Sequence, residues 1–236
     1  TINNMDKGNL VHEVLETLYL PYLGKILKAT DFDQMRHKLL PLMEDKYQSI
    51  YHGNNKRTGR NYIIFEVLKK SIFDFLAIEE AHVNKGNEIK ILALEKPFQH
   101  SINIPGLDFP IKIIGVVDRM DEFNGNLRII DYKTGVIESK QLRLIDWKAL
   151  RENADLTYLF QILLYSYVHR DIISGYNGPS VGIITFRNLP EYFMPFESKI
   201  DNGQALCKDN LDNFQGVLFE LIGEIFNSRI PFKESR

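Results

Sequence analysis

The chain has 236 residues and a formal net charge of −2, with 44% hydrophobic and 25% charged residues. This composition is typical of a globular protein and excludes a fibrous or intrinsically disordered chain. The balance of 29 basic and 31 acidic residues gives no global sign of nucleic acid binding, although one local basic groove is enough for it. No apolar run approaches the roughly 20 residues that span a bilayer, so we expect no membrane partner.

The chain contains one cysteine, Cys207. A single cysteine excludes an internal disulfide, and it leaves too few thiolates for an iron–sulfur cluster within this chain. We therefore expect a reducing, cytoplasmic location. The sequence starts at Thr1 without an initiator methionine, and we expect it to be a fragment of a larger protein.

The first third of the sequence is predicted to be helical. Apolar residues recur at helical spacing over residues 7–28, 30–51 and 62–83. Because proline lacks a backbone N–H, we expect Pro21 to bend or end the first helix and Pro41 to interrupt the second.

The pattern changes near residue 86 to alternating, β-branched segments that predict strands. Three strands follow one another over residues 87–104, 111–123 and 126–134, and the tight turn FNGN between the last two predicts an antiparallel hairpin. The remaining predicted elements are a helix over 156–176, strands over 180–188 and 192–196, and an amphipathic helix over 204–228. The order indicates one α/β (α+β) domain.

Charged residues lie at the ends of two predicted strands in the stretch GVVDRMDEFNGNLRIIDYKTG. Side chains two residues apart in a strand share a face, so Asp131 and Lys133 point the same way. Asp118 follows Ile114 and Val116 on one face of the neighbouring strand. The hairpin can therefore bring Asp118 beside Asp131.

Two carboxylates at one place raise each other's pKa unless a cation lies between them. Mg²⁺ is usually held by one or two carboxylates with water and phosphate oxygens, and the ammonium of Lys133 suits a developing negative charge. This pattern favours metal-assisted hydrolysis of a phosphodiester, with Mg²⁺ or Mn²⁺ as cofactor. The simpler alternative is a pair of surface salt bridges, Asp118 with Arg119 and Asp131 with Lys133.

The segments GVVDRMD and IIDYKTG resemble the RecB-like nuclease branch of the PD-(D/E)xK superfamily. Two further motifs of that branch are present in the same order: GNLVHEVLE supplies Gly8 and His12, and QILLY supplies Gln161 and Tyr165. The resemblance extends to the C-terminal nuclease domains of AddB-type helicase/nuclease subunits.

The resemblance implies a restriction-endonuclease-like core, in which helices flank a central mixed β-sheet. It implies one nuclease domain over residues 1–236, with an N-terminal helical insertion at about 25–85, the core at about 86–200 and a C-terminal helix at 204–228. Many relatives also hold an iron–sulfur cluster, with one cysteine before the histidine motif and three near the C-terminus. Cys207 does not fit that pattern, so a cluster is expected only in a full-length parent protein.

The resemblance also implies which residues form the site. His12, Asp118, Asp131 and the backbone carbonyl of Tyr132 would bind the metal, and Lys133 would orient the attacking water or stabilise the transition state.

A second set of residues is expected near this site. Gln161 and Tyr165 share a helix face and would bind a phosphate or hold Lys133 in place. Glu95, on the preceding strand, and Arg119, in the aspartate motif, are second-tier candidates. A solvent-facing role for Glu95 is about equally consistent with the sequence.

Three basic residues in the loop HGNNKRTGR, Lys56, Arg57 and Arg60, are candidates for DNA contact. Trp147 and Tyr158 are candidates for stacking on bases. A solvated loop and packed aromatic rings are the alternatives.

The leading hypothesis is a metal-dependent deoxyribonuclease that processes DNA ends in recombinational repair. Its partners would be single-stranded DNA or duplex ends and a helicase domain or subunit. One alternative is a catalytically silent nuclease-fold module that binds DNA or acts as a scaffold. Another is a phosphohydrolase of small substrates, which the absence of a Walker-type glycine-rich loop disfavours.

Overall fold

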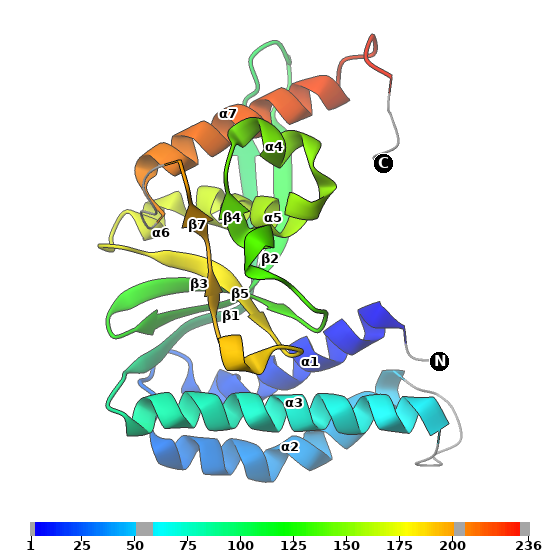
Figure 1. Cartoon of the computed structure of the whole chain (residues 1–236), viewed down its shortest axis with the longest axis vertical. Helices are drawn as coiled ribbons and strands as arrows, with labels where there is room; N and C mark the ends of the chain where they lie inside the picture. The colour runs from blue at the N-terminus through cyan, green and yellow to red at the C-terminus, as the bar shows by residue number, and fades with distance from the viewer. Residues whose placement is uncertain (1–2, 51–58, 201–205, 232–236) are drawn as a thin grey trace.

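A computed structural model describes residues 3–50, 59–200 and 206–231 of the chain. The fold has three layers, with a β-sheet between two groups of helices (Figure 1). Helices α1 (Asn4–Tyr19), α2 (Ala29–Ile50) and α3 (Gly59–Asn84) cover one face of the sheet. Helices α4 (Trp147–Glu152), α5 (Thr157–Val168) and α7 (Lys208–Ile225) lie on the other side.

The first two helices show how proline acts at two different positions. Helix α1 ends at Tyr19, and a short 3-10 turn, Leu20–Tyr22, contains Pro21 as expected. Helix α2, by contrast, continues through Pro41, so the predicted interruption is wrong. Pro41 removes one backbone hydrogen bond. The burial of Leu39 and Met43 on either side outweighs that loss.

The central sheet is mixed, as expected. Its strand order is β1-β2-β3-β5-β6, in which the first three strands are antiparallel, β5 is parallel to β3 and β6 is antiparallel to β5. The turn between β2 and β3 has positive φ at Asn124 (52°) and Gly125 (79°), the conformation that a tight Asn-Gly hairpin turn requires. The strands are β1 (Ile89–Ile102), β2 (Ile111–Phe123), β3 (Asn126–Lys133), β5 (Ser180–Thr185) and β6 (Met194–Pro195).

Several short elements escape prediction from the sequence. The helix predicted over 156–176 is divided into α5 and α6 (Arg170–Ile173). Helix α4 and a two-stranded sheet of β4 (Arg143–Leu144) and β7 (Glu197–Ser198) are too short to produce a periodic pattern. Single 3-10 turns at Ser139–Leu142, Ala154–Leu156 and Leu189–Glu191 complete the described elements.

Alternation along β3 divides the hydrophobic core into two. Leu127 and Ile129 pack toward α5 and α7, whereas Ile130 and Tyr132 pack toward α1 and α3. Helices α2 and α3 fall within the segment expected as a helical insertion, and the sheet falls within the expected core. This architecture confirms the predicted fold class. In the described part of the chain, every helix is too short or too polar to cross a bilayer.

The long β1–β2 hairpin changes direction at Glu95, whose φ of 40° is unusual in a strand. Beyond this point Ile113 and Val117 face the α5–α7 core, while Ile114 and Val116 are 73% and 40% exposed. The expectation that Ile114 and Val116 support Asp118 on a buried face is therefore wrong. Asp118 also lies inside β2 and not at its end.

Candidate metal centre

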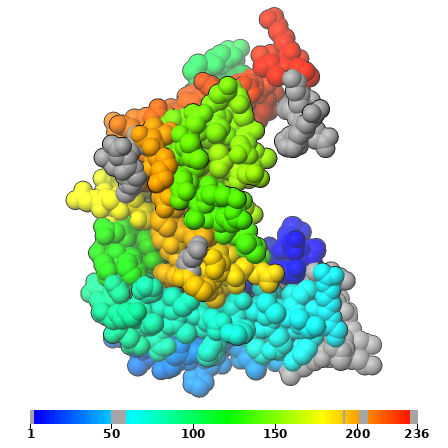
Figure 2. Space-filling view, viewed as in Figure 1, coloured from blue at the N-terminus to red at the C-terminus, as the bar shows by residue number. Residues whose placement is uncertain are grey.

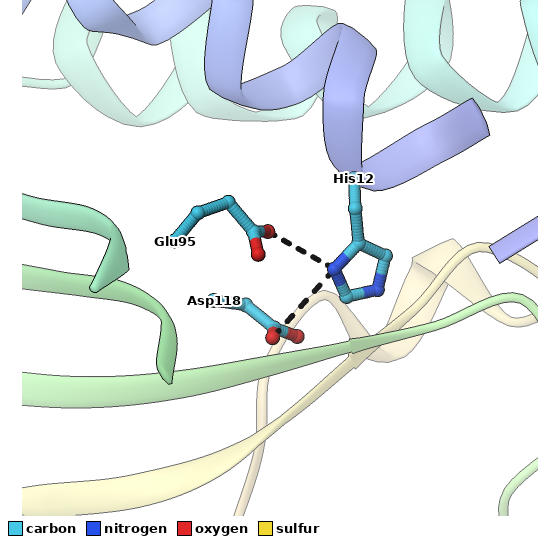
Figure 3. Close-up of side chains that lie close together, drawn as sticks. All are labelled: His12, Glu95 and Asp118. Carbon is cyan, nitrogen blue, oxygen red and sulfur yellow. Dashed lines mark hydrogen bonds and ion pairs between the residues drawn. The ribbon is translucent and has the colours of Figure 1, made fainter. Parts of the chain in front are cut away.

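His12, Glu95 and Asp118 converge from three different elements, α1, β1 and β2 (Figure 3). One ligand atom from each lies within 4.8 Å of the others. Nδ1 of His12 is 3.0 Å from Oε1 of Glu95 and 3.6 Å from Oδ1 of Asp118. Glu95, expected only as a second-tier residue, is thus part of the closest cluster.

Local structure explains why these side chains meet. Val11, Val14 and Leu15 are buried and hold α1 against the sheet, which leaves His12 on the edge of that stripe. Glu95 has a left-handed backbone conformation that costs a non-glycine residue about 1 kcal/mol or more. Strain of this kind persists where the surrounding structure imposes it, and it is common at functional sites.

The backbone of Tyr132 joins the cluster. Its carbonyl oxygen is 3.2 Å from Nε2 of His12, and its N–H donates a 2.6 Å hydrogen bond to Oδ2 of Asp118. Both ring nitrogens of His12 therefore face oxygen atoms. Burial lowers the pKa of His12, but the hydrogen bond with Glu95 and the charge of Asp118 outweigh burial and raise the pKa to about 9. The cluster attracts a positive charge to this position.

The carboxylates of this site carry too little compensating charge. Burial, and then the charge of Asp131, raise the pKa of Asp118 to about 7 from its usual value of 3.8. Burial also raises the pKa of Asp131, although Lys133 and a hydrogen bond from Tyr165 oppose the increase. A divalent cation would remove this deficit.

Asp131 and Lys133 form the second part of the site. Nζ of Lys133 lies 2.6 Å from Oδ2 of Asp131, which is not one of the three most closely grouped ligands. Gln161 donates a 2.7 Å hydrogen bond from Nε2 to the Tyr165 hydroxyl, which itself bonds to Asp131. Gln161 and Tyr165 thus reach Asp131, and not Lys133 as expected.

Arg119 lies on the opposite face of the sheet from Asp118, because neighbouring residues in a strand point to opposite faces. It is fully buried and pairs with Glu79 at 3.0 Å and with Asp121 at 2.6 Å. Its link to the site is indirect, through a 3.3 Å hydrogen bond to the Tyr132 hydroxyl. The structure therefore separates Arg119 from the ligand cluster.

Sequence reasoning did not identify Glu79, the partner of Arg119. A signal existed, because Glu79 follows Ile72, Phe75 and Leu76 on the buried stripe of α3. A carboxylate in such a stripe requires a buried partner.

A hollow of about 450 Å³ opens in front of His12. Glu95, Lys133, Glu13 and Glu16 are among its lining residues. Arg60 and Tyr158 line a neighbouring hollow, whereas Trp147 lies at a separate one beside α7. Lys56 and Arg57 lie outside the described residues.

The donor set fits a hard divalent ion. Carboxylate and carbonyl oxygens with one imidazole nitrogen suit Mg²⁺ or Mn²⁺, not a soft metal. Across the described ranges, no other three His, Cys, Asp or Glu side chains converge in this way. The Cys207 thiol is instead engaged with Oδ1 of Asn210 at the start of α7.

Comparisons with known proteins agree with this geometry. The chain is 30% identical over 200 residues to an ATP-dependent helicase/nuclease protein of Listeria monocytogenes, covering 78% of this chain and 14% of that protein. It is 28% identical over 137 residues to an uncharacterised protein of Rickettsia conorii, covering 58% of this chain and 15% of that protein. The chain thus spans about one seventh of the length of these curated relatives.

The crystal structure of SSO0001 matches 95% of this chain and 88% of its own, with 15% identity and a TM-score of 0.30. The family model of the PD-(D/E)XK nuclease superfamily matches residues 1–236. Because that match runs the full length of the chain, and the Listeria similarity adds a helicase/nuclease relative, this protein belongs to the PD-(D/E)XK nuclease superfamily, in its RecB-like branch.

Proposed function

We propose that residues 1–236 form one metal-dependent deoxyribonuclease domain that acts on DNA ends in recombinational repair. The observation that carries the proposal is the convergence of His12, Glu95 and Asp118 beside the Asp131–Lys133 pair. The printed name of the Listeria relative, a helicase/nuclease, supports a partner that is a helicase domain or subunit.

Four groups of the chain would hold one Mg²⁺ or Mn²⁺: the side chains of His12, Glu95 and Asp118 and the carbonyl oxygen of Tyr132. Asp131 lies next to this set and would complete it from the Lys133 side. When bound, the ion would stabilise the negative charge that develops on the phosphate and lower the pKa of the attacking water. Loss of any one carboxylate would leave the set short of charge.

Lys133 is the residue placed to act on the reacting atoms. Its ammonium lines the hollow in front of His12, where it can donate hydrogen bonds to a water or to a phosphate oxygen. Asp131 fixes the ammonium in that position at 2.6 Å. Tyr165 holds Asp131, and Gln161 holds Tyr165, so the helix α5 determines where Lys133 points.

A cleavage assay tests this function. Labelled single-stranded and duplex DNA would be incubated with Mg²⁺ or Mn²⁺ and with the wild type, Asp118→Ala or Lys133→Ala. Asp108→Ala, which alters an exposed aspartate outside the site, is the matched control. We expect cleavage by the wild type and the control, and a loss of at least about a hundredfold in the other two variants.

A wild type that binds DNA but cuts neither form with either metal would contradict the proposal. That result would identify the catalytically silent module instead.

A further inference from the structure

A second hollow, here called the basic groove, meets the metal centre at Lys133 and Thr134. It has a volume of about 860 Å³ and shares Asn4, Lys133 and Thr134 with the hollow in front of His12. The start of α1, the first half of α3 and the segment after β3 form its walls. The outline of the molecule is hollowed beside the start of α1, below the lobe that carries α4 and α7 (Figure 2).

Every charged side chain that lines the basic groove is positive. The hollow at the metal centre is different, because three glutamates line it. The chain as a whole is slightly negative, so the positive lining is a local feature. The charged residues of the basic groove are Lys7, Arg60, Lys133 and Arg187.

These charges are available to an anion. Lys133 pairs with Asp131, and Lys7 has a neutral partner, the side-chain oxygen of Asn4 at 2.9 Å. Within the described residues, Lys7, Arg60 and Arg187 form no ion pair. A polyanion that entered the groove would therefore gain Coulomb attraction without breaking existing pairs.

The floor of the groove is apolar. Ile63 and Val67 of α3 are 64% and 43% exposed, and Val136 on the loop after β3 is 68% exposed. Tyr158 also lines the groove, with its ring centroid 5.8 Å from Nζ of Lys133. A duplex presents phosphates to a protein surface and keeps its base faces inside. Unpaired bases, by contrast, pack well on aromatic and apolar side chains.

We propose that the basic groove binds a single, unpaired nucleic acid strand that continues from the phosphate at the metal centre. The bases would lie against Ile63, Val67 and Tyr158. The phosphates would lie against Arg60 and Arg187 at the rim. This inference rests on the proposed nuclease function and adds the form of the substrate, since a duplex must open before its strand can follow this path.

Fluorescence anisotropy of the full chain tests the inference. The probes are a labelled thymidine oligonucleotide of about 20 nucleotides and a duplex of equal length, long enough to cover a typical single-strand site. Both are measured in EDTA, so that binding is observed without hydrolysis. The variants are Arg60→Glu, Arg187→Glu and Ile63→Ser, and the matched control is Lys148→Glu, an exposed lysine outside the groove.

Each arginine variant should weaken single-strand binding about tenfold and lower the slope of log affinity against log salt by about 0.7 for each phosphate that is no longer bound. Ile63→Ser should weaken single-strand binding about fivefold and leave duplex binding unchanged, because it removes only a packing surface for bases. Lys148→Glu should bind both probes as the wild type does. All four positions are exposed, so thermal melting should show that each variant remains folded.

Normal single-strand binding by both arginine variants would overturn the inference, and so would an equal loss of both probes in Ile63→Ser. The test is separate from the test of nuclease activity. A protein that binds the single strand through the groove but cleaves nothing with Mg²⁺ keeps the groove and loses the proposed function. A protein that cleaves DNA while its groove variants bind normally keeps the function and loses the groove.

Discussion

Two clusters of charged residues lie back to back on β2, and they differ in how their charges are balanced. On the face toward α3, Arg119 and Arg128 pair with Glu79 and Asp121, and all four side chains are buried. On the other side, Asp118 and its neighbours form the candidate metal centre. We call the first the arginine network.

Two aspartates three residues apart show the consequence. Burial alone would raise the pKa of Asp121, but Arg119 and Arg128 outweigh burial and lower it. Asp118 lacks such partners, and its pKa is raised to about 7. A balanced cluster stabilises the fold as it stands, whereas an unbalanced one retains an unmet demand for a cation. The comparison therefore separates structural charge from functional charge within one strand.

The largest predicted effect is on the arginine network. Arg119→Met should lower the free energy of unfolding by about 3–5 kcal/mol, because Glu79 and Asp121 would remain buried without their shared partner. Urea denaturation measures this change. The control is Arg143→Met, which breaks a half-exposed pair with Glu197 and should cost less than about 1 kcal/mol. Equal effects of the two substitutions would remove the distinction between the clusters.

The next effect is on catalysis. Lys133→Met should slow DNA cleavage about a hundredfold or more at saturating metal, because the transition state loses a nearby positive charge. The unfolding free energy should change far less than in Arg119→Met, since Lys133 is partly exposed. Single-turnover kinetics and urea denaturation on the same preparations check both statements. A variant with wild-type cleavage rates would show that Lys133 takes no part in the reaction.

The two clusters should also respond differently to pH. Metal ligands must be deprotonated, so the raised pKa values of His12, about 9, and Asp118, about 7, set protons in competition with the ion. Affinity for Mn²⁺ should therefore rise as pH increases from 6 to 8, by about tenfold or more. Calorimetry in buffers of different ionisation enthalpy measures the affinity and the protons released. An affinity that stays constant over this range would contradict the assignment of these ligands.

The smallest effect is expected at the support of Asp131. Gln161→Leu removes the hydrogen bond to the Tyr165 hydroxyl and should slow cleavage about fivefold, consistent with one neutral hydrogen bond of about 1 kcal/mol. Metal affinity should remain near that of the wild type. Parallel cleavage and calorimetric measurements distinguish the two readouts. A loss of metal binding equal to that of a ligand variant would place Gln161 closer to the ion than its geometry allows.

Much of the candidate site follows from local rules of sequence. Strand alternation places Asp131 and Lys133 on one face, and the Asn124–Gly125 turn fixes the hairpin that brings Asp118 near them. The same alternation places Arg119 on the opposite face, so its separation from the cluster was within reach of the sequence.

Other features depend on contacts between distant segments. The role of Glu95 arises from its left-handed backbone, which no local pattern indicates. The change of direction there also explains why Ile114 and Val116 are exposed. Glu79 meets Arg119 only because α3 packs on the sheet, and a residue 40 positions away in sequence cannot be paired by periodicity.

The most direct test of the central claim is a calorimetric titration of the metal-free protein with Mn²⁺. The wild type and the control Asp108→Asn, which alters an exposed aspartate, should each bind Mn²⁺ at the His12–Glu95–Asp118 cluster. Asp118→Asn should bind it at least about a hundredfold more weakly, because the set loses a charged ligand. Equal Mn²⁺ binding by Asp118→Asn and the wild type, or no binding by either, would contradict the claim that the unbalanced cluster is a metal site.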